Sequence, residues 1–536
     1  MKQKTSAVPA SVKAAWSQYE AGKAYKRRIG LYETVRRNER FYRGEQWQSG
    51  EGSDLPKPVF NIIRRVIDYL ICSVAATNLS IRFADDNLPF VRNPKEAQQI
   101  KGALELLRIN TEYRWEKNAI NRKLFNVLTD AAISGDGIFY CYWDTSLRSP
   151  QLFSGDIVTD VIDNVNLFVA DVNRADLQSQ EYLILAGRAS VASLRKEAEE
   201  AGASEEEWKR ILPDSDLSSQ SGDLSRYELE GESEAKTTYL IKFWKEDGRV
   251  VFEKSTKDCL IRRGRTDCRL YPVAYFNWTP TKNSFHGTSP ITSLIPNQRF
   301  INRAYAMAMK HMTDTAFSKV VYDKSKIPEW NNEVGQAIAA VGGGNISDAV
   351  SVVGVGEMQS GYMELIGQSV ELTKELMGAT EAALGDADAH NTSAILALQE
   401  TSRIPLEQVR QAYYRCVEDL ANIWADMMCA YYPSERLLPY RDKDELSVDQ
   451  ANFELLKQGC LSARIDVAEI TRYTAAGAQS MLDKLLEGGH ISPAAYIRRL
   501  PSGLLCDRQA LIEELEHPTH EGADESEQEV CDERGA

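Results

Sequence analysis

An apolar repeat in the C-terminal third of the chain sets the strongest limit on its fold. The apolar side chains recur at spacings of three and four residues: Leu406, Val409, Tyr413, Cys416, Val417, Leu420, Trp424, Met427, Met428 and Tyr431. This period is that of one face of an α-helix. With a start near Ser393, the helix has about 40 residues and a length of roughly 60 Å at 1.5 Å per residue. The predicted helix therefore exceeds the radius of a compact domain.

Length and composition indicate a folded protein of more than one structural unit. A chain of 536 residues exceeds what one hydrophobic core usually supports. Apolar residues make up 43% and charged residues 26%, which is ordinary for a globular protein. Because no apolar run approaches the roughly 20 residues of a bilayer span, we expect no membrane insertion. The first twelve residues contain no apolar signal core, so nothing in them indicates secretion.

The distribution of charge along the chain is more informative about binding partners than the net charge of −15. That total argues against unspecific gripping of nucleic acid, because affinity for phosphate comes mainly from Lys and Arg. Residues 1–43 nevertheless contain eleven Lys or Arg and three acidic residues. Residues 516–536 contain eight acidic residues and only Arg534 as a base, and we expect a disordered acidic tail there. The basic N-terminal helix could dock on an acidic neighbour, including another copy of this chain.

Periodicity predicts an α+β chain in which a strand-rich region lies between helical regions. Residues 95–135 have a helical pattern that ends at a Ser-Gly-Asp-Gly stop, and a long helical pattern covers residues 290–317. Aromatic and β-branched segments between them predict strands at 138–143, 157–161, 167–170, 182–186 and 271–277. The segments 238–244 and 249–253, separated by Glu246-Asp247-Gly248, predict a hairpin. Short helices are expected at 204–212 and 333–340, and short strands at 320–322 and 350–353.

A conspicuous block lies near the N-terminus, with the sequence Phe41-Tyr42-Arg43-Gly44-Glu45-Gln46-Trp47. Before it, residues 32–42 form an arginine-rich helical pattern that Gly44 can end, because glycine adopts left-handed backbone cheaply. After it, Asn61 can cap a second helix with apolar positions at helical spacing up to Leu70. Taken alone, this spacing is equally typical of an ordinary amphipathic helix pair.

The order of these elements resembles the N-terminal region of portal proteins of tailed bacteriophages, especially the podovirus-like branch. The second half, with a helix, a small α/β insert, a helix, a polar loop and a very long helix, also resembles the portal plan. The resemblance implies a portal-type fold with an α/β wing, a two-helix stem, a small α/β clip, a long spanning helix and a helical crown. The implied parts are an N-terminal arm and wing at 1–287, stem helix 1 at 288–318, a clip at 319–360, stem helix 2 at 361–381, a tunnel loop at 382–392, the long helix and wing return at 393–467, a helical crown at 468–515 and the acidic tail at 516–536.

The resemblance also implies a function without catalysis and without a cofactor. Twelve copies would form a ring at one capsid vertex, through which the terminase large subunit loads double-stranded DNA and through which DNA later leaves. Further implied partners are the major capsid protein and scaffold, and head-completion or tail adaptor proteins. The implied location is the virion, after assembly in the host cytoplasm.

Candidate site residues follow from this plan. A conduit should not grip DNA, so acidic or neutral walls with few basic groups suit it better than a basic sleeve. The candidates for the channel wall are Glu364, Glu371, Lys374, Glu375, Asp386, Asp388, His390 and Asn391. The candidates for subunit or capsid contact are Arg36, Arg37, Arg40, Trp47, Arg64 and Arg65.

Sequence motifs of common enzymes are missing. The chain has no GxxxxGK[ST] phosphate loop, no HExxH and no GxSxG arrangement. Two alternatives remain open: a metal-dependent nuclease, for which a carboxylate pair such as Asp386 and Asp388 could bind a divalent ion, and a helical scaffold without a channel. A ring with a central hole would separate the portal interpretation from both.

Overall fold

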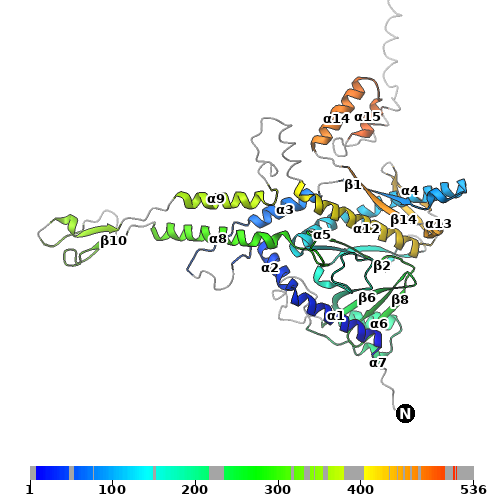
Figure 1. Cartoon of the computed structure of the whole chain (residues 1–536), viewed down its shortest axis with the longest axis horizontal. Coiled ribbons are helices and arrows are strands. Elements are labelled where there is room, and N and C mark those ends of the chain that lie inside the picture. The colour runs from blue at the N-terminus through cyan, green and yellow to red at the C-terminus, as the bar shows by residue number, and fades with distance from the viewer. Residues whose placement is uncertain are drawn as a thin grey trace, which may run out of the picture. The chain divides into compact units, whose positions relative to one another are not determined.

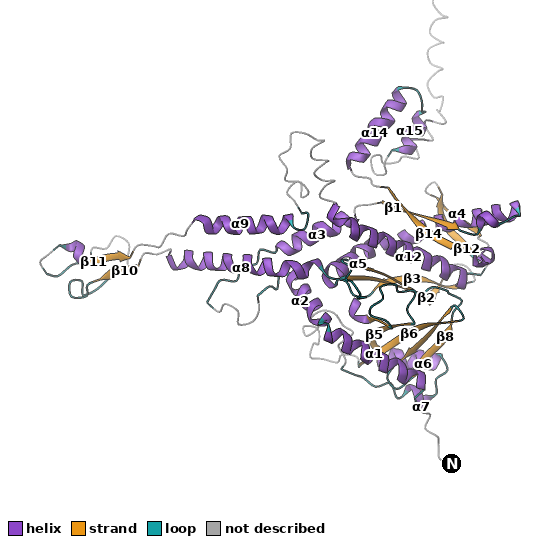
Figure 2. Ribbon diagram, viewed as in Figure 1, coloured by secondary structure: helices purple, strands orange, loops and turns teal. Residues whose placement is uncertain are grey.

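The computed structural model divides the chain into two compact units. The first comprises Met1–Val74, Arg122–Tyr142 and Ile157–Ile423, and the second comprises Ala75–Asn121, Trp143–Asp156 and Trp424–Ala536. The structure describes residues 8–47, 54–75, 78–148, 153–215, 235–315, 319–330, 338–342, 345–353, 360–379, 404–433, 435–442, 445–450, 453–458, 461–468, 472–500, 511–512 and 515. Helices and strands occur in both units, which confirms the predicted α+β class (Figure 2).

A five-stranded antiparallel sheet is the largest sheet of the first unit. Its strand order is β4-β5-β6-β7-β8. The bounds are Leu167–Val169 for β4, Tyr182–Ser190 for β5, Lys236–Glu246 for β6, Arg249–Ser255 for β7 and Leu260–Arg265 for β8. Asp247 and Gly248, with φ of 50° and 73°, form the tight turn between β6 and β7. Positive φ at both positions is typical of the type I′ turn of a two-residue hairpin, and β6 pairs antiparallel with β7, so the predicted hairpin is confirmed.

A second sheet has the order β3-β2-β9. Its strands are β2 (Asp136–Arg148), β3 (Ser154–Val161) and β9 (Val273–Asn277), and Asp136 lies opposite Asn277 in the antiparallel register. Apolar side chains from both sheets form one buried cluster, which includes Ile138, Leu183 and Phe285. This shared core joins the two sheets within the first unit.

Helices flank these sheets and lead out of them. In the first unit they are α1 (Ala10–Arg28), α2 (Leu31–Arg43), α3 (Ile62–Ala75), α5 (Ile120–Ser134), α6 (Val191–Glu200), α7 (Glu205–Trp208), α8 (Pro290–Thr315) and α9 (Ser360–Glu375), with a 3-10 turn at Asn164–Asn166. Helix α1 packs on the five-stranded sheet (Figure 1). In this contact Tyr19 meets Phe168 edge to face, with ring centroids 4.9 Å apart. Between α8 and α9 lie strands β10 (Lys319–Tyr322) and β11 (Val350–Val353), which pair antiparallel, and a 3-10 turn at Ile346–Asp348.

The second unit joins segments far apart in the sequence. Strand β1 (Asn78–Asp85) pairs antiparallel with β14 (Leu461–Ala468), and β12 (Leu437–Asp442) pairs with β13 (Glu445–Gln450). Its helices are α4 (Pro94–Lys117), α13 (Phe453–Gln458), α14 (Arg472–Glu487) and α15 (Pro493–Arg499), with a 3-10 turn at Leu88–Phe90. The Asp156 carboxylate lies 2.9 Å from the Arg114 guanidinium and 3.2 Å from the Lys117 ammonium, so the buried arginine has a charged partner.

Three sequence predictions differ from the structure. The long helix, α12, begins at Glu407 and ends at Tyr431, after a 3-10 turn at Ile404–Leu406. Pro405 lies in that turn, because proline lacks the N–H that a helix interior needs. The helix expected at 204–212 is only the four residues of α7, and residues 338–340 of the helix expected at 333–340 have no regular structure. Residues 393–403 and 331–337 lie outside the described part of the chain.

Candidate functional site

Helices α8 and α9 form an antiparallel pair, with the β10–β11 hairpin between them in the chain (Figure 1). The Asn297 side-chain amide donates to the Thr373 hydroxyl over 3.2 Å. The Tyr362 hydroxyl lies 4.0 Å from the Met307 sulfur. Met307 follows Asn297 on α8, whereas its partner Tyr362 precedes Thr373 on α9. The two contacts therefore define an antiparallel register.

One face of α9 is acidic and exposed. Ile366 and Thr373 are buried on its α8-facing side. Glu364, Gln368, Glu371 and Glu375 are all exposed and follow spacings of four, three and four residues. At about 100° per residue, these four positions fall on one side of the helix, opposite Ile366 and Thr373. We call these four residues the acidic stripe.

The remaining channel candidates are placed differently. Lys374 is half-buried and lies off the acidic stripe. Together with Arg65 and Phe60, it lines a pocket of about 270 Å³ between α3 and α9. The fold thus brings together one candidate for the channel and one for subunit contact, which the sequence had assigned to separate surfaces. Asp386, Asp388, His390 and Asn391, with the whole loop 382–392, lie outside the described residues.

The block 41–47 ends helix α2 as its sequence predicts. Gly44 has a φ of 92°, and the N–H groups of Gly44 and Glu45 donate to the last carbonyls of α2, those of Phe41 and Arg40. The buried Gln46 side chain then donates to the Phe41 carbonyl over 3.2 Å. Trp47 is half-buried, and its indole N–H donates to the Pro58 carbonyl over 2.9 Å, so it closes the loop within this chain.

Asn61 caps α3, which confirms a second prediction. Its side-chain oxygen accepts from the Arg64 N–H over 3.1 Å, and its amide donates to the Tyr42 carbonyl over 2.9 Å. This cap contacts the preceding loop as well, because the Gln46 amide donates to the same Asn61 oxygen over 3.1 Å.

Two side chains on α8 anchor this block, and the sequence analysis missed both. Gln298 accepts from the Ile62 N–H over 3.0 Å and donates to the Phe60 carbonyl over 2.7 Å. Asn302 donates to Gln46 over 2.6 Å. Gln298 and Asn302 are buried polar residues four positions apart on a helix otherwise rich in apolar residues. That pattern is the only signal in the sequence for the anchor.

The arginine candidates lie on the surface of α2 and α3. Arg36, Arg37, Arg40, Arg64 and Arg65 are all exposed. Arg40 lies 3.7 Å from Glu45 and Arg64 lies 3.6 Å from Asp68, which are loose surface ion pairs of small energetic value.

Arg37 differs from the other arginines, because it lines a groove of about 490 Å³ with residues of α8. Two further arginines, Arg299 and Arg303, and the apolar side chains of Phe300 and Met307 line the same groove. We call it the basic groove.

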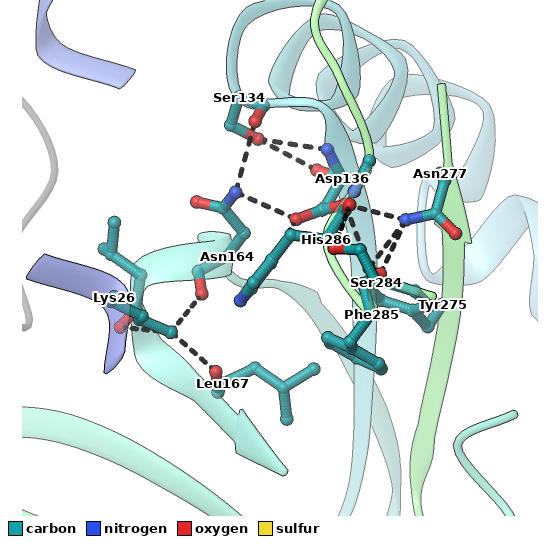
Figure 3. A network of polar contacts seen from close by, with 12 residues as sticks. Lys26, Ser134, Asp136, Asn164, Leu167, Tyr275, Asn277, Ser284, Phe285 and His286 are labelled. Carbon is teal, nitrogen blue, oxygen red and sulfur yellow. Dashed lines mark hydrogen bonds and ion pairs between the residues drawn. The ribbon is translucent and has the colours of Figure 1, made fainter. Parts of the chain in front are cut away.

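A buried polar network surrounds Asp136 at the start of β2 (Figure 3). One carboxylate oxygen accepts from the Gly287 N–H over 2.7 Å and from Tyr275 and Asn277 over 2.9 Å each. The other lies 2.7 Å from His286 Nδ1 and accepts from Asn164 over 3.0 Å. Burial alone would raise the pKa of Asp136, but His286 and the hydrogen bonds from Gly287 and Asn164 bring that pKa below its ordinary value.

Lys26 connects α1 to this region. Its buried ammonium group donates to the carbonyls of Asn164 and Leu167 over 2.6 Å each, and of Val165 over 3.0 Å. Burial lowers the pKa of Lys26 well below its ordinary value, and the charge of Asp136 opposes this. Both carboxylate oxygens of Asp136 and the Lys26 ammonium have structural partners, whereas Asn164 Oδ1 is buried without a hydrogen-bond partner in the described structure. We interpret the network as the anchor of α1, because its charged groups are bonded within the chain.

Within the described ranges, no group of three or more His, Cys, Asp or Glu side chains is arranged to hold a metal ion. No helix in the part of the chain that the structure describes has the length and apolar character of a membrane span.

Part of the chain is similar to a known protein family. Residues 205–448 match the model of the Phage P22-like portal protein family. The resemblance to portal proteins is confirmed for this segment. The matched residues run from α7 into β13 and therefore contain the basic-groove helix α8, the β10–β11 pair, α9 and α12.

Solved structures give only remote likenesses. A chain in "Virion of native gene transfer agent (GTA) particle" has 10% identity and a TM-score of 0.34, with 81% of this chain and 87% of the other covered. A chain in "Neck of empty GTA particle computed with C6 symmetry" has 11% identity and a TM-score of 0.32, with coverage of 84% and 89%. Similarity at this level does not establish a common fold. No curated protein matches the chain.

Proposed function

We propose that this chain is the subunit of a phage portal ring at one capsid vertex. The observation that carries the proposal is the match of residues 205–448 to the P22-like portal protein family. In this proposal, twelve copies surround a channel through which double-stranded DNA is packaged and later ejected. The partners are the terminase large subunit, the major capsid protein and scaffold, and head-completion or tail adaptor proteins. The ring assembles in the host cytoplasm and remains in the virion.

In the finer proposal, α8 and α9 are the stem helices, the β10–β11 region belongs to the clip, and loop 382–392 is the tunnel loop. The acidic stripe, with Glu364, Glu371 and Glu375 exposed on the side of α9 away from α8, supports a place on the channel wall. Carboxylates repel DNA phosphates, so such a wall lets the duplex slide where a basic wall would hold it. Lys374, half-buried beside α3, would contribute less to this surface than its sequence position suggests.

Electron microscopy of the purified full chain tests the proposal. We expect rings with a central hole, and a mass by analytical ultracentrifugation near twelve times 60.2 kDa. A monomer that cleaves DNA in the presence of magnesium would support the nuclease alternative. An assembly without a hole would support a scaffold, and either result would overturn the portal proposal.

A second experiment addresses the tunnel loop. A bulky tag inserted within residues 382–392 should block packaging of DNA into capsids while rings still form. The control is the same tag in the acidic tail, at residues 516–536, which should leave both packaging and ring formation intact. Normal packaging with the tag in the loop would exclude this segment from the narrowest part of the channel.

A further inference from the structure

We propose that the basic groove of one copy receives the exposed face of α9 from a second copy. This deepens the proposed function, because it names the surfaces by which neighbours in the ring would meet. The groove and α9 both belong to the first unit, and their exposed side chains are complementary in charge and in apolar character.

The groove offers cationic groups around an apolar floor. Phe300 is 48% exposed and Met307 is 45% exposed, although both are large apolar side chains. Arg37, Arg299 and Arg303 surround them, and no acidic residue occurs among the described residues that line the groove. The Nε atom of Arg299 is buried without a hydrogen-bond partner in the described structure, while its guanidinium lies over the Phe41 ring. Arg37 and Arg303 are exposed, so a ligand with carboxylates and apolar side chains would complement the charge and the apolar floor of the groove.

Helix α9 presents such a combination. Leu365, Leu372 and Leu376 are 49%, 58% and 74% exposed, at spacings of seven and four residues. These leucines form an apolar strip along one edge of the acidic stripe, roughly 100° around the helix from its centre. Glu371 and Glu375 flank the strip, so the leucines can enter the groove while the glutamates approach its arginines. In this arrangement Glu371 and Glu375 belong to the subunit contact, and Glu364 and Gln368 of the acidic stripe remain for the channel wall.

Within one chain the two surfaces do not meet. The side of α9 that contacts α8 contains Ile366 and Thr373, whereas the acidic stripe lies on the opposite side. On α8, Asn297 and the groove residue Met307 contact α9, but they contact Thr373 and Tyr362, which are not part of the acidic stripe or the leucine strip. A second copy is therefore needed. Because the donor and acceptor surfaces differ, the contact is heterologous, and repetition of such a contact closes a ring when the rotation permits.

DNA is a weaker candidate for this groove. Its phosphates could pair with Arg37 and Arg303, but a phosphate backbone offers no apolar group for Phe300 and Met307. The leucine strip of α9 accounts for both the charge and the exposed apolar surface. We therefore argue for the second copy, and DNA binding becomes one outcome of the test.

A charge-swap experiment tests the contact in the full chain. The groove variant has Arg37→Glu and Arg303→Glu, and the stripe variant has Glu371→Lys and Glu375→Lys. We expect each to raise the protein concentration for half-assembly at least tenfold, because like charges then face each other. An equimolar mixture should assemble again. In it, the acidic groove of one variant meets the basic stripe of the other, and the remaining two surfaces are unchanged.

Matched controls are Arg122→Glu on α5 and Glu199→Lys on α6, exposed helix charges outside both surfaces, which should leave assembly unchanged. Circular dichroism checks that each variant is folded. If charge reversal unfolds the chain, the milder Arg303→Gln and Glu375→Gln variants replace it. We expect each of these to raise the protein concentration for half-assembly about threefold.

Three outcomes overturn the inference: both variants assemble like the unmodified chain, the mixture does not recover assembly, or the groove variant loses only binding to a DNA duplex. Rings of the unmodified chain accompanied by any of these outcomes leave the portal proposal intact. Failure of the unmodified chain to form rings would overturn the portal proposal itself.

Discussion

Asp136 shows how a single buried carboxylate holds together segments that are distant in the sequence. Its five polar contacts come from residues of β9, of the turn at 164–166 and of the segment before α8. We expect Asp136→Asn to lower the free energy of unfolding by about 3–5 kcal/mol, because the change leaves buried donors facing an amide. Urea denaturation followed by circular dichroism measures this. The matched control is the exposed Asp314→Asn, which should cost less than about 1 kcal/mol.

The same residue gives a pH dependence with a definite sign. Because the pKa of Asp136 is lower in the folded chain than in the unfolded chain, the ionised carboxylate stabilises the fold above the ordinary aspartate pKa. This contribution is lost as the pH falls through the lowered folded value. The deficit of Asp136→Asn should therefore be full at pH 7 and shrink below about pH 4. A deficit that stays constant down to pH 2 would show that the carboxylate charge does not matter.

At the scale of elements, the end of α2 depends on the backbone of Gly44. A Cβ at this position would touch Asn61 and Val59 only at 3.6 and 3.7 Å, so space is sufficient and the φ of 92° is the obstacle. We expect Gly44→Ala to destabilise the fold by about 1–2 kcal/mol in thermal or urea denaturation. Gly102→Ala is the control, since Gly102 lies inside α4 with open space around it and alanine favours helix there by up to about 1 kcal/mol. Equal effects of Gly44→Ala and Gly102→Ala on stability would contradict the conclusion that the positive φ of Gly44 ends α2.

The elements that local chemistry determines could be predicted from the sequence. The stop at Gly44, the cap at Asn61 and the turn at Asp247-Gly248 each depend on one or two residues with special backbone or side-chain preferences. The pairing of strands that are distant in the sequence could not be predicted, because the periodicity of a strand does not indicate which strand it pairs with. The pairing of β1 with β14 joins residues nearly 400 positions apart. The predicted start of the long helix, near Ser393, was wrong. The prediction followed the apolar repeat and did not take into account that Pro405 interrupts the helix.

The candidate site was predictable only as residue types. The glutamates of α9 follow helical spacing, so a common face could be expected from the sequence. The basic groove could not be predicted, because Arg37 lies on α2 and Arg303 on α8, and these helices are far apart in the sequence. Nothing in the local pattern of α8 shows that Phe300 and Met307 remain exposed while Ile301 and Ala304 are buried. Which face of α8 is covered depends on α2, α3 and α9 together.

At the scale of the whole molecule, a net charge of −15 conceals local patches of opposite sign, such as the basic groove and the acidic stripe. In a ring, every copy would use its basic groove and its α9 face once, so each pairing recurs at every interface. A modest attraction per contact then acts many times. For the same reason, loss of a single type of contact affects all interfaces at once. Assembly should thus respond more steeply to changes in charge than the folding of one copy does.

Ionic strength separates a charged contact from a purely apolar one. The distance over which charges interact falls from about 10 Å at 0.1 M salt to about 3 Å at 1 M. If arginines of the groove meet glutamates of α9, the concentration of the unmodified chain at half-assembly should rise about tenfold over this range, as light scattering would measure. For the equimolar mixture of groove and stripe variants, the concentration at half-assembly should also rise with salt, because its contacts are also between opposite charges. Each variant alone should assemble better in high salt, which screens its repulsion. An assembly that strengthens with salt in the unmodified chain would indicate that leucine burial alone joins the copies, and that the arginines and glutamates do not pair.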